Sequence, residues 1–591
     1  MSHNKDELLA VQDFRVKKMS HPSHVTTYIK EQQRIASTGV RGRRPDEALL
    51  SFYASMEHLC STAGSLLDYI SLSAVITAIA QLSPSAPAKS GFKPSANSAA
   101  FELKRFWGVL LLQLEPMTSA VGAREISNIL WSSAKLGLHP DAFVPGMTDA
   151  LAAKVLQLTR GEGRRQPSAQ RCANSLWALA TLGHHPADKG LIDAVCNHFA
   201  MLIKHHDKSK QPNAKNAANV VWAVATLGHE PANKGLVDAV CNHFAMLIEH
   251  HDKNKRPNAQ AAAMVMWAVA TLGHEPADKG LADVVCNHFA MLIKHHDESK
   301  RPNAQTAAIV VWAVATMGHD PADKGLVDAV CKHFAMLTKH HDVFKRPSAQ
   351  GAANVMWALG KMNHAPSDSV ASDILERFMV LCGLPRQAPN AQELSNTLYA
   401  CAMLRLKVKD HVRLALVDGL LRIDRSCGYK QHYCNAAWSL AVSGVLSSEM
   451  FLALLERLQP LPTAEPTHVA LTRQGLFQLY QALDFLHPLP MAAAQQLQGM
   501  VTRLGPGPLP KERSAADLSA SEDLCAVLEQ LRVAFTANVP LSGYQAAAVL
   551  QPRDDVTVPV VLVTKAFDHF RNQHWSCAFS LCSLYITAMY G

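Results

Sequence analysis

A repeat of 45 residues limits what this chain can fold into more than any other feature. One copy, residues 257–301, reads PNAQAAAMVMWAVATLGHEPADKGLADVVCNHFAMLIKHHDESKR, and the copies on both sides are nearly identical. A tryptophan marks the same position in five successive copies, as Trp177, Trp222, Trp267, Trp312 and Trp357. A fixed period of this length is typical of solenoids, in which each unit buries its apolar surface against its neighbours.

Weaker copies flank the regular block, which spans residues 167–366. Upstream lie SAVITAIAQL, with Thr77 in the tryptophan position, and ISNILWSSAKLGLHP around Trp131. Downstream lie LSNTLYACAMLRL with Tyr399, CNAAWSLAVSGVL with Trp438 and LFQLYQALDFLHP with Tyr480. We therefore expect an array of about nine or ten units over residues 60–503, with degenerate copies capping its ends.

The remaining segments differ from the array in composition. Residues 1–59 are expected to form a separate N-terminal region, used for targeting or partly disordered. Residues 504–523 are rich in proline and serine and are typical of a linker, as is the shorter stretch 84–98. Residues 524–591 then form a C-terminal segment.

Each unit predicts two helices. The first opens after proline with Asn or Ser at the N-cap, such as Asn213, and ends near Leu227, where Gly228 suits a left-handed C-cap. Pro231 cannot continue that helix. The second helix, about residues 236–251, carries apolar residues at helical spacing and leads into a lysine-rich turn. The expected fold is all-α, a right-handed α-solenoid of helix-turn-helix units.

Composition excludes several classes of protein. No apolar stretch is long enough for a membrane helix, so membrane insertion is not expected. The 13 cysteines form no CxxC pair, which favours a reducing compartment over a disulfide scaffold. Basic residues exceed acidic ones by 8, an excess compatible with a polyanionic partner.

Catalytic and metal motifs are missing from the sequence. It contains no P-loop, no HExxH and no GxSxG, so we expect neither an enzyme nor a small-molecule substrate nor a cofactor. The 29 histidines are numerous because each belongs to a copied unit, as the His205-His206 pair and its equivalents show. No metal site is therefore expected.

Polar residues of the first helix gather on one side. On an ideal helix Lys215, Asn216, Asn219, Ala223 and Thr226 fall within an arc of about 100°, and the other positions are apolar. We expect this arc to form a polar groove along the array. Small Ala223 near its centre is expected to let a flat ligand approach the backbone.

Three positions of that arc vary between copies while the rest of the helix changes little. Such variation is what a modular reader of bases needs, although drift of solvent-facing residues after duplication gives the same pattern. The candidate contacts are Gln170, Arg171, Asn174, Lys215, Asn216, Asn219, Gln260, Met264, Gln305, Thr306, Gln350 and Asn354; Ala261, Ile309 and Gly351 occupy the equivalent places.

The turn before each proline adds positive charge. One or two cations per unit are suited to following a phosphate backbone, while ordinary solvated charges are the alternative, since an aspartate in most of these turns offsets part of the charge. The candidate phosphate contacts are Arg164, Arg165, Lys210, Lys255, Arg256, Lys300, Arg301, Lys345 and Arg346.

The segments ISNILW, CANSLWALATLGHHP, AANVVWAVATLGHEP and LSNTLYACAML resemble the repeat of octotricopeptide-repeat proteins, and are similar to those of the FAST-kinase-like and RAP-domain families. The unit here is longer, and the PPPEW-like element of those families is not evident. The resemblance implies an α-solenoid that binds specific organellar RNAs and acts in their stability, processing, splicing or translation, together with other RNA-processing proteins.

The tail resembles the start of a RAP domain. VTVPVVLVTKAFDHFRNQHW, residues 556–575, is similar to its opening strand and the His-Phe pair that follows, here His569 and Phe570. The family resemblance implies an organelle, the chloroplast in preference to the mitochondrion. The first thirty residues mix acidic with basic residues and do not form a clear transit peptide.

The sequence thus favours a protein that binds single-stranded RNA along its first helices, about one nucleotide per repeat. A protein-binding solenoid of the armadillo or tetratricopeptide type is the alternative. Apolar Met264 and Ile309 at variable positions favour that alternative, whereas Arg171 and the asparagines favour RNA.

Overall fold

The computed structural model forms two compact units, residues 1–285 and 286–591. The residues that it describes are 16, 19–40, 45–63, 66–83, 99–161, 166–188, 190–229, 235–274, 280–318, 325–423, 430–458, 475, 478, 479, 482, 495, 499, 535–541, 544–550 and 560–562. Both expected linkers and the His-Phe pair of the RAP-like segment lie outside these residues, as does Pro231.

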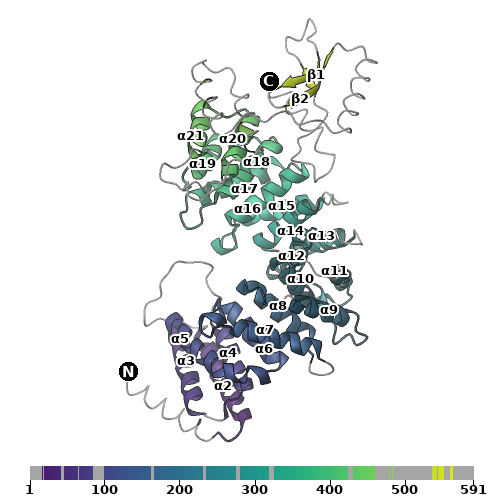
Figure 1. Ribbon diagram of the computed structural model, residues 1–591. Coiled ribbons are helices and arrows are strands. Elements are labelled where there is room, and N and C mark those ends of the chain that lie inside the picture. Colours follow the sequence, from purple (N-terminus) through teal and green to yellow (C-terminus); the bar gives the residue numbers. More distant parts are fainter. Residues whose placement is uncertain are drawn as a thin grey trace. The chain divides into compact units, whose positions relative to one another are not determined.

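The first unit consists of helical hairpins whose helices pack in two rows (Figure 1). In the first row each helix contacts the next, in the order α2 (Pro22–Val40), α4 (Tyr69–Leu82), α6 (Ala123–Leu136), α8 (Ala169–Leu182), α10 (Ala214–Thr226) and α12 (Ala259–Thr271). The second row holds α3 (Pro45–Thr62), α5 (Ala99–Leu114), α7 (Met147–Arg160), α9 (Gly190–Ile203) and α11 (Gly235–Ile248). Short 3-10 turns lie at η2 (Glu115–Ala120), η3 (Pro140–Ala142) and η5 (Lys253–Lys255).

The second unit repeats this plan. Its first row is α14 (Ala304–Met317), α16 (Ala349–Met362), α18 (Ala391–Met403) and α20 (Lys430–Val442), each in contact with the next. Its second row is α15 (Gly325–Thr338), α17 (Asp368–Cys382), α19 (Asp410–Leu421) and α21 (Ser448–Leu458), with η6 (Glu298–Lys300) and η7 (Val343–Lys345) in the turns. The boundary between the units falls within α13 (Gly280–Ile293). The all-α array of paired helices is therefore confirmed.

Two features differ from the expected domain plan. Helices α2 and α3 form a hairpin, and α2 also contacts α4, so helical packing begins within the N-terminal region assigned to residues 1–59. A small antiparallel sheet, in the order β1 (Phe535–Leu541), β2 (Tyr544–Leu550) and β3 (Val560–Leu562), follows the array. Ala537 pairs with Ala548 and Val549 with Val561. Strand β3 falls within the RAP-like segment.

Local capping explains where the first helices begin and end. The side chain of Asn213 accepts a hydrogen bond of 2.9 Å from the backbone N–H of Asn216, and Asn258, Asn303 and Ser348 cap their helices in the same way. These caps satisfy N–H groups that the first helical turn leaves unpaired. At the other end Gly228 has φ of +60°, the left-handed conformation that glycine adopts without strain.

Two kinds of histidine hold each repeat in place. Within a repeat, the Nε2–H of His243 donates to the carbonyl oxygen of Pro212 at 2.7 Å, as His198 does to Pro167 and His333 to Pro302. Between repeats, His274 donates to the carboxylate of Asp238 at 2.9 Å; the pairs His229–Asp193 and His364–Asp328 repeat this bond. The abundance of histidine therefore reflects structural bonds that were copied with each unit.

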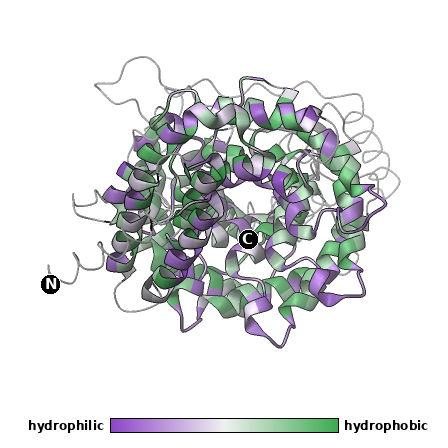
Figure 2. Cartoon of the chain, turned by 90° about the horizontal axis from the view of Figure 1, so that it is seen from below, coloured by the Kyte–Doolittle hydropathy of each residue, from purple (hydrophilic) through white to green (hydrophobic). Residues whose placement is uncertain are grey.

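The core lies between the two rows of helices in each unit. Phe244 and Cys241 on α11 are 0% and 2% exposed, and their equivalents at 45-residue spacing are buried too. Figure 2 shows hydrophobic residues along both rows and hydrophilic residues in the turns that join them. Among the described residues, no helix combines the length and the apolar character that crossing a membrane requires.

Candidate nucleic-acid interface

On the first helices from α6 to α20, a line of four side chains is mostly open to solvent or half-buried; the exceptions are Asn219, Met403 and Trp438, which are buried. These residues stand at positions i, i+4, i+7 and i+11, one side of an α-helix. We name this line the first-helix stripe; in the first unit it holds Arg124, Asn128, Trp131 and Lys135 on α6, Gln170, Asn174, Trp177 and Thr181 on α8, Lys215, Asn219, Trp222 and Thr226 on α10, and Gln260, Met264, Trp267 and Thr271 on α12.

The second unit carries the same stripe with the same order of chemistry. Its members are Gln305, Ile309, Trp312 and Thr316 on α14, Gln350, Asn354, Trp357 and Lys361 on α16, Gln392, Asn396, Tyr399 and Met403 on α18, and Gln431, Asn435, Trp438 and Val442 on α20. In most repeats an amide or a cation comes first, a second amide follows, and an aromatic ring comes third. Amide groups can pair with base edges, and rings can stack on base faces.

The aromatic residues of neighbouring first helices lie against one another. The ring centroids of Trp222 and Trp267 are 6.4 Å apart in the first unit, and those of Trp312 and Trp357 are 6.4 Å apart in the second. Tyr399 and Trp438 stack at 5.4 Å. The rings contact each other, so a base would stack on the exposed part of a ring and would not enter between two rings.

The aromatic position was missed in the sequence prediction, which counted tryptophan among the buried apolar residues. Trp177, Trp222, Trp267, Trp312 and Trp357 are in fact all half-buried. The signal was present in the sequence, because each tryptophan follows the first stripe position by seven residues and therefore shares its side of the helix.

The predicted groove is wrong for part of its arc. Ala223 is 0% exposed and Asn216 is 9% exposed, and Thr306 and Ala261 are buried in the same way. The reason is visible at Gly351, the equivalent of Asn216, where a Cβ would stand 3.8 Å from side-chain atoms of Ala308 and Phe334. This side of the helix packs on the preceding repeat.

The other candidate residues lie on the stripe or beside it. Gln170, Lys215, Gln260, Gln305 and Gln350 are exposed, and Asn174, Met264, Ile309 and Asn354 are half-buried. Asn219 retains 8% exposure, less than its equivalents. Arg171 is half-buried next to the stripe. The structure thus brings together the first and third variable positions and buries most of the second.

Lysine replaces threonine at the last stripe position in two repeats. The Lys361 ammonium lies 4.8 Å above the ring of Trp357, and that of Lys135 lies 5.6 Å from the ring of Trp131. Such cation–π contacts orient the ring and its cation together. Burial lowers the pKa of Lys361 to about 8, so the cation next to this ring titrates near neutral pH.

The basic turns contain two kinds of cation. Arg256, Arg301 and Arg346 each donate from Nε to the carbonyl oxygen of a histidine six residues earlier, at 2.7–2.8 Å, and are half-buried. These arginines hold the turn together. Lys210, Lys255, Lys300 and Lys345 are exposed. The candidates Arg164 and Arg165 lie outside the described residues.

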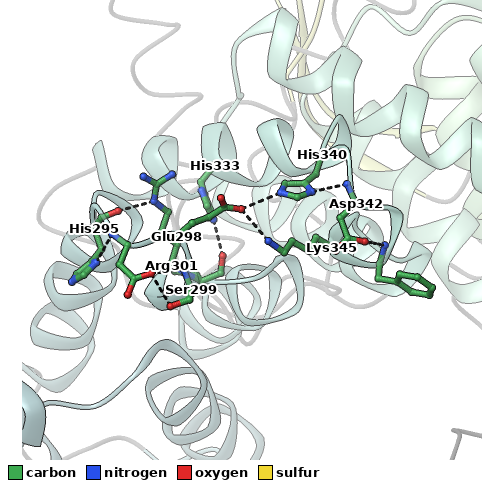
Figure 3. A network of polar contacts seen from close by, with 11 residues as sticks. His295, Glu298, Ser299, Arg301, His333, His340, Asp342 and Lys345 are labelled. Carbon is green, nitrogen blue, oxygen red and sulfur yellow. Dashed lines mark hydrogen bonds and ion pairs between the residues drawn. The ribbon is translucent and has the colours of Figure 1, made fainter. Parts of the chain in front are cut away.

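One turn carries an acid where two other turns carry lysine. Glu298 takes the place of Lys208 and Lys253, and its carboxylate lies 3.1 Å from both His340 Nε2 and Lys345 Nζ of the next turn (Figure 3). Two hydrogen bonds lower the pKa of the Glu298 carboxyl to about 2: the bond from His340 has the larger effect, and the bond from Lys345 the next largest. This acid therefore neutralises part of the positive charge in the second unit.

The repeated cysteines of the second helices are buried. Burial raises the pKa of the Cys241 and Cys331 thiols to about 12, and a protonated buried thiol is not reactive.

The paired histidines stabilise the turns in which they lie. In each described pair the first ring accepts a backbone N–H and the second stacks on it, as in His250 and His251 with centroids 4.3 Å apart.

Comparison with protein-family models gives no match for this chain, and comparison with curated protein sequences gives none either. The residues of the first-helix stripe and of the basic turns therefore carry the functional inference.

Proposed function

We propose that this protein binds single-stranded RNA along the first-helix stripe of each unit, with about one nucleotide per repeat. The observation that supports this most is that an amide or a cation recurs seven residues before an aromatic ring on the same side of each first helix from α6 to α20, with a second amide between them in most of these helices. Helical-repeat proteins that read RNA use two or three side chains per repeat, and the first three positions of the stripe can supply them.

The stripe supplies both general affinity and base preference. Its aromatic position is nearly constant, and stacking on aromatic rings accepts every base. Its second position varies between Asn174 or Asn354 and apolar Met264 or Ile309, so hydrogen bonding to a base edge differs from repeat to repeat. Exposed lysines of the turns would contact phosphates.

The mechanism that follows is occupancy. A bound RNA segment is protected from nucleases or is held apart from competing base pairs, and no bond is made or broken. The resemblance to octotricopeptide-repeat proteins extends this proposal to an organellar transcript, with effects on stability, processing, splicing or translation.

A protein-binding solenoid is the second candidate, favoured by one turn. Phe344 is 96% exposed and Val343 is 58% exposed at η7, where the equivalent turns carry polar residues. An exposed aromatic of this kind is typical of a contact with another protein. It lies in a single turn, whereas the stripe recurs on the first helices from α6 to α20, so RNA is the primary proposal.

A selection from a random RNA pool tests the proposal. The full chain should enrich a motif, and the logarithm of its affinity should fall linearly with the logarithm of salt concentration. The matched control replaces exposed methionines of the second helices, Met246 and Met336, with alanine, which should leave RNA affinity unchanged. Affinity no greater than that for a polyanion control would reject the RNA proposal and direct the search to peptide partners.

A further inference from the structure

Three side chains that can bind a metal ion meet at one junction of the first unit. His139 and Asp141 lie in the turn after α6, and His184 follows directly after α8, more than 40 residues later in the chain. Asp141 Oδ2 is 3.8 Å from His139 Nδ1 and 4.0 Å from His184 Nδ1. Two imidazoles and one carboxylate within 4.8 Å of one another form a set of ligands from two repeats.

The hydrogen bonds around this cluster leave acceptor atoms facing each other. The carboxylate of Asp149 accepts the Nε2–H of His184 at 3.0 Å, so in the neutral ring Nδ1 carries a lone pair directed to the cluster. Asp141 Oδ1 is used by the backbone N–H of Thr148 at 2.7 Å, which leaves Oδ2 for another partner. His139 Nδ1 accepts the backbone N–H of Asp141 at 3.3 Å, a long bond that a metal ion would replace.

We propose that His139, Asp141 and His184 bind a divalent transition-metal ion, with zinc as the first candidate. Imidazole nitrogen and carboxylate oxygen are ligands that zinc takes at about 2.0–2.2 Å. A tetrahedral site with such bonds needs ligand atoms roughly 3.4 Å apart. The two histidine–aspartate distances of 3.8 and 4.0 Å must therefore shorten, as must the distance between the two histidine nitrogens, which lie within 4.8 Å of each other. The His139 and Asp141 side chains are 34% and 30% exposed, which allows this movement and gives water access to the remaining position.

Asp149 acts as a positioning residue in this site. A histidine that binds a metal through one ring nitrogen commonly donates its other N–H to a carboxylate, which fixes the tautomer and the ring orientation. The 3.0 Å bond between His184 and Asp149 has this form. The same histidine–aspartate bond recurs at His229 and Asp193, so this part of the site was already present in the repeat.

The next junction lacks a complete set of ligands. There His185 takes the place of His139, but Ala187 takes the place of Asp141. The bond between His229 and Asp193 is kept, but the carboxylate ligand is missing. This junction is therefore a matched control within the same molecule. The metal ion would join the turn after α6 to the turn after α8, at the point where the weaker repeats meet the regular block.

The test measures tight zinc equivalents on the full chain, stripped with a chelator and titrated with zinc in the presence of a competing chromogenic chelator. Other histidines bind zinc weakly, so variants identify the site. Asp141→Asn keeps an oxygen that accepts the Thr148 N–H. This variant and the single variant His139→Asn should each bind one tight zinc equivalent fewer than the original chain. Asp149→Asn should weaken this equivalent by about 10–100-fold, and Asp193→Asn should change nothing.

A second readout separates a metal site from a local ion pair. Zinc should raise the melting temperature of the original chain and of Asp193→Asn, but not that of Asp141→Asn, and magnesium should raise none of them. Equal numbers of tight zinc equivalents in the original chain and in Asp141→Asn would overturn the proposal. No RNA is present in either measurement, so the outcome is independent of RNA binding.

Discussion

The Nε2–H of His243 donates to the carbonyl oxygen of Pro212 at 2.7 Å, which ties the second helix of a repeat to the residue that starts its first helix. His243 is 3% exposed, so water cannot replace this bond. His198 and His333 make the same bond in their repeats. The stability of these three repeats therefore depends on a buried histidine.

His243→Ala should destabilise the chain by about 2–4 kcal/mol, because it leaves a buried carbonyl without a donor and creates a cavity. Urea unfolding followed by circular dichroism measures the change. Asn242→Ala, at the exposed neighbouring position, is the control and should stay within about 0.5 kcal/mol of the original chain. Equal stability of the two variants would show that the bond contributes nothing.

Histidines with a lowered pKa predict a loss of stability in acid. Burial lowers the pKa of His243, His333 and His432 below the ordinary value of 6.5. Below pH 6.5 the unfolded chain therefore binds more protons than the folded chain, and the free energy of unfolding falls as pH decreases toward the folded-state pKa values. Unfolding measured from pH 7.5 to pH 5 should show this decline. His243→Gln should reduce its slope, and an unchanged slope would argue against protonation of this residue.

Trp222→Ala should weaken RNA binding by about 1–3 kcal/mol, the usual contribution of one stacked base. Trp222→Phe keeps a ring and should retain most of the affinity. Fluorescence anisotropy with the selected RNA measures both, and circular dichroism checks that the fold is intact. If alanine and phenylalanine weaken binding equally, stacking is not the role of this position.

Asn219→Met converts one stripe position to the residue found at Met264, the equivalent place in the next repeat. We expect base preference to change at one position of the selected motif, with little change elsewhere, because the proposed binding mode assigns about one nucleotide to each repeat. Selection from a random pool with both proteins gives the comparison. Identical motifs would mean that Asn219, at 8% exposure, does not reach the base.

Glu298→Gln should strengthen RNA binding at low salt and leave the fold unchanged. The variant removes a carboxylate with a pKa of about 2 and releases Lys345 for a phosphate. One additional phosphate contact should steepen the plot of log affinity against log salt by about 0.7. Salt titration of both proteins provides the test. An unchanged slope would indicate that Lys345 lies away from the RNA.

Much of the fold could be predicted because the evidence is local. The N-cap of Asn213, the left-handed Gly228 and the apolar spacing of the second helices lie within one repeat and act on nearby backbone. The hairpin of α2 and α3 was not predicted, since its sequence lacks the tryptophan and the proline–asparagine start of the regular copies.

The stripe was predicted only in part because its direction depends on packing between repeats. An ideal helix placed the open arc about 40° from where contacts with neighbours leave it, so Asn216 and Ala223 are buried while Trp222 is half-buried. The cluster of His139, Asp141 and His184 was not expected. Its residues belong to two repeats, and no local spacing relates them.

The histidine bonds also bear on how such a chain changes over evolutionary time. The bond from His243 to Pro212 lies within one copy, and the bond from His274 to Asp238 needs only a second copy behind the first. A recombination event that inserts or deletes one whole 45-residue copy therefore recreates the same joint on both sides. Under the RNA-binding mode proposed above, the number of bases covered would then rise or fall by one at a time, and the gene would alter its target length without redesigning any surface.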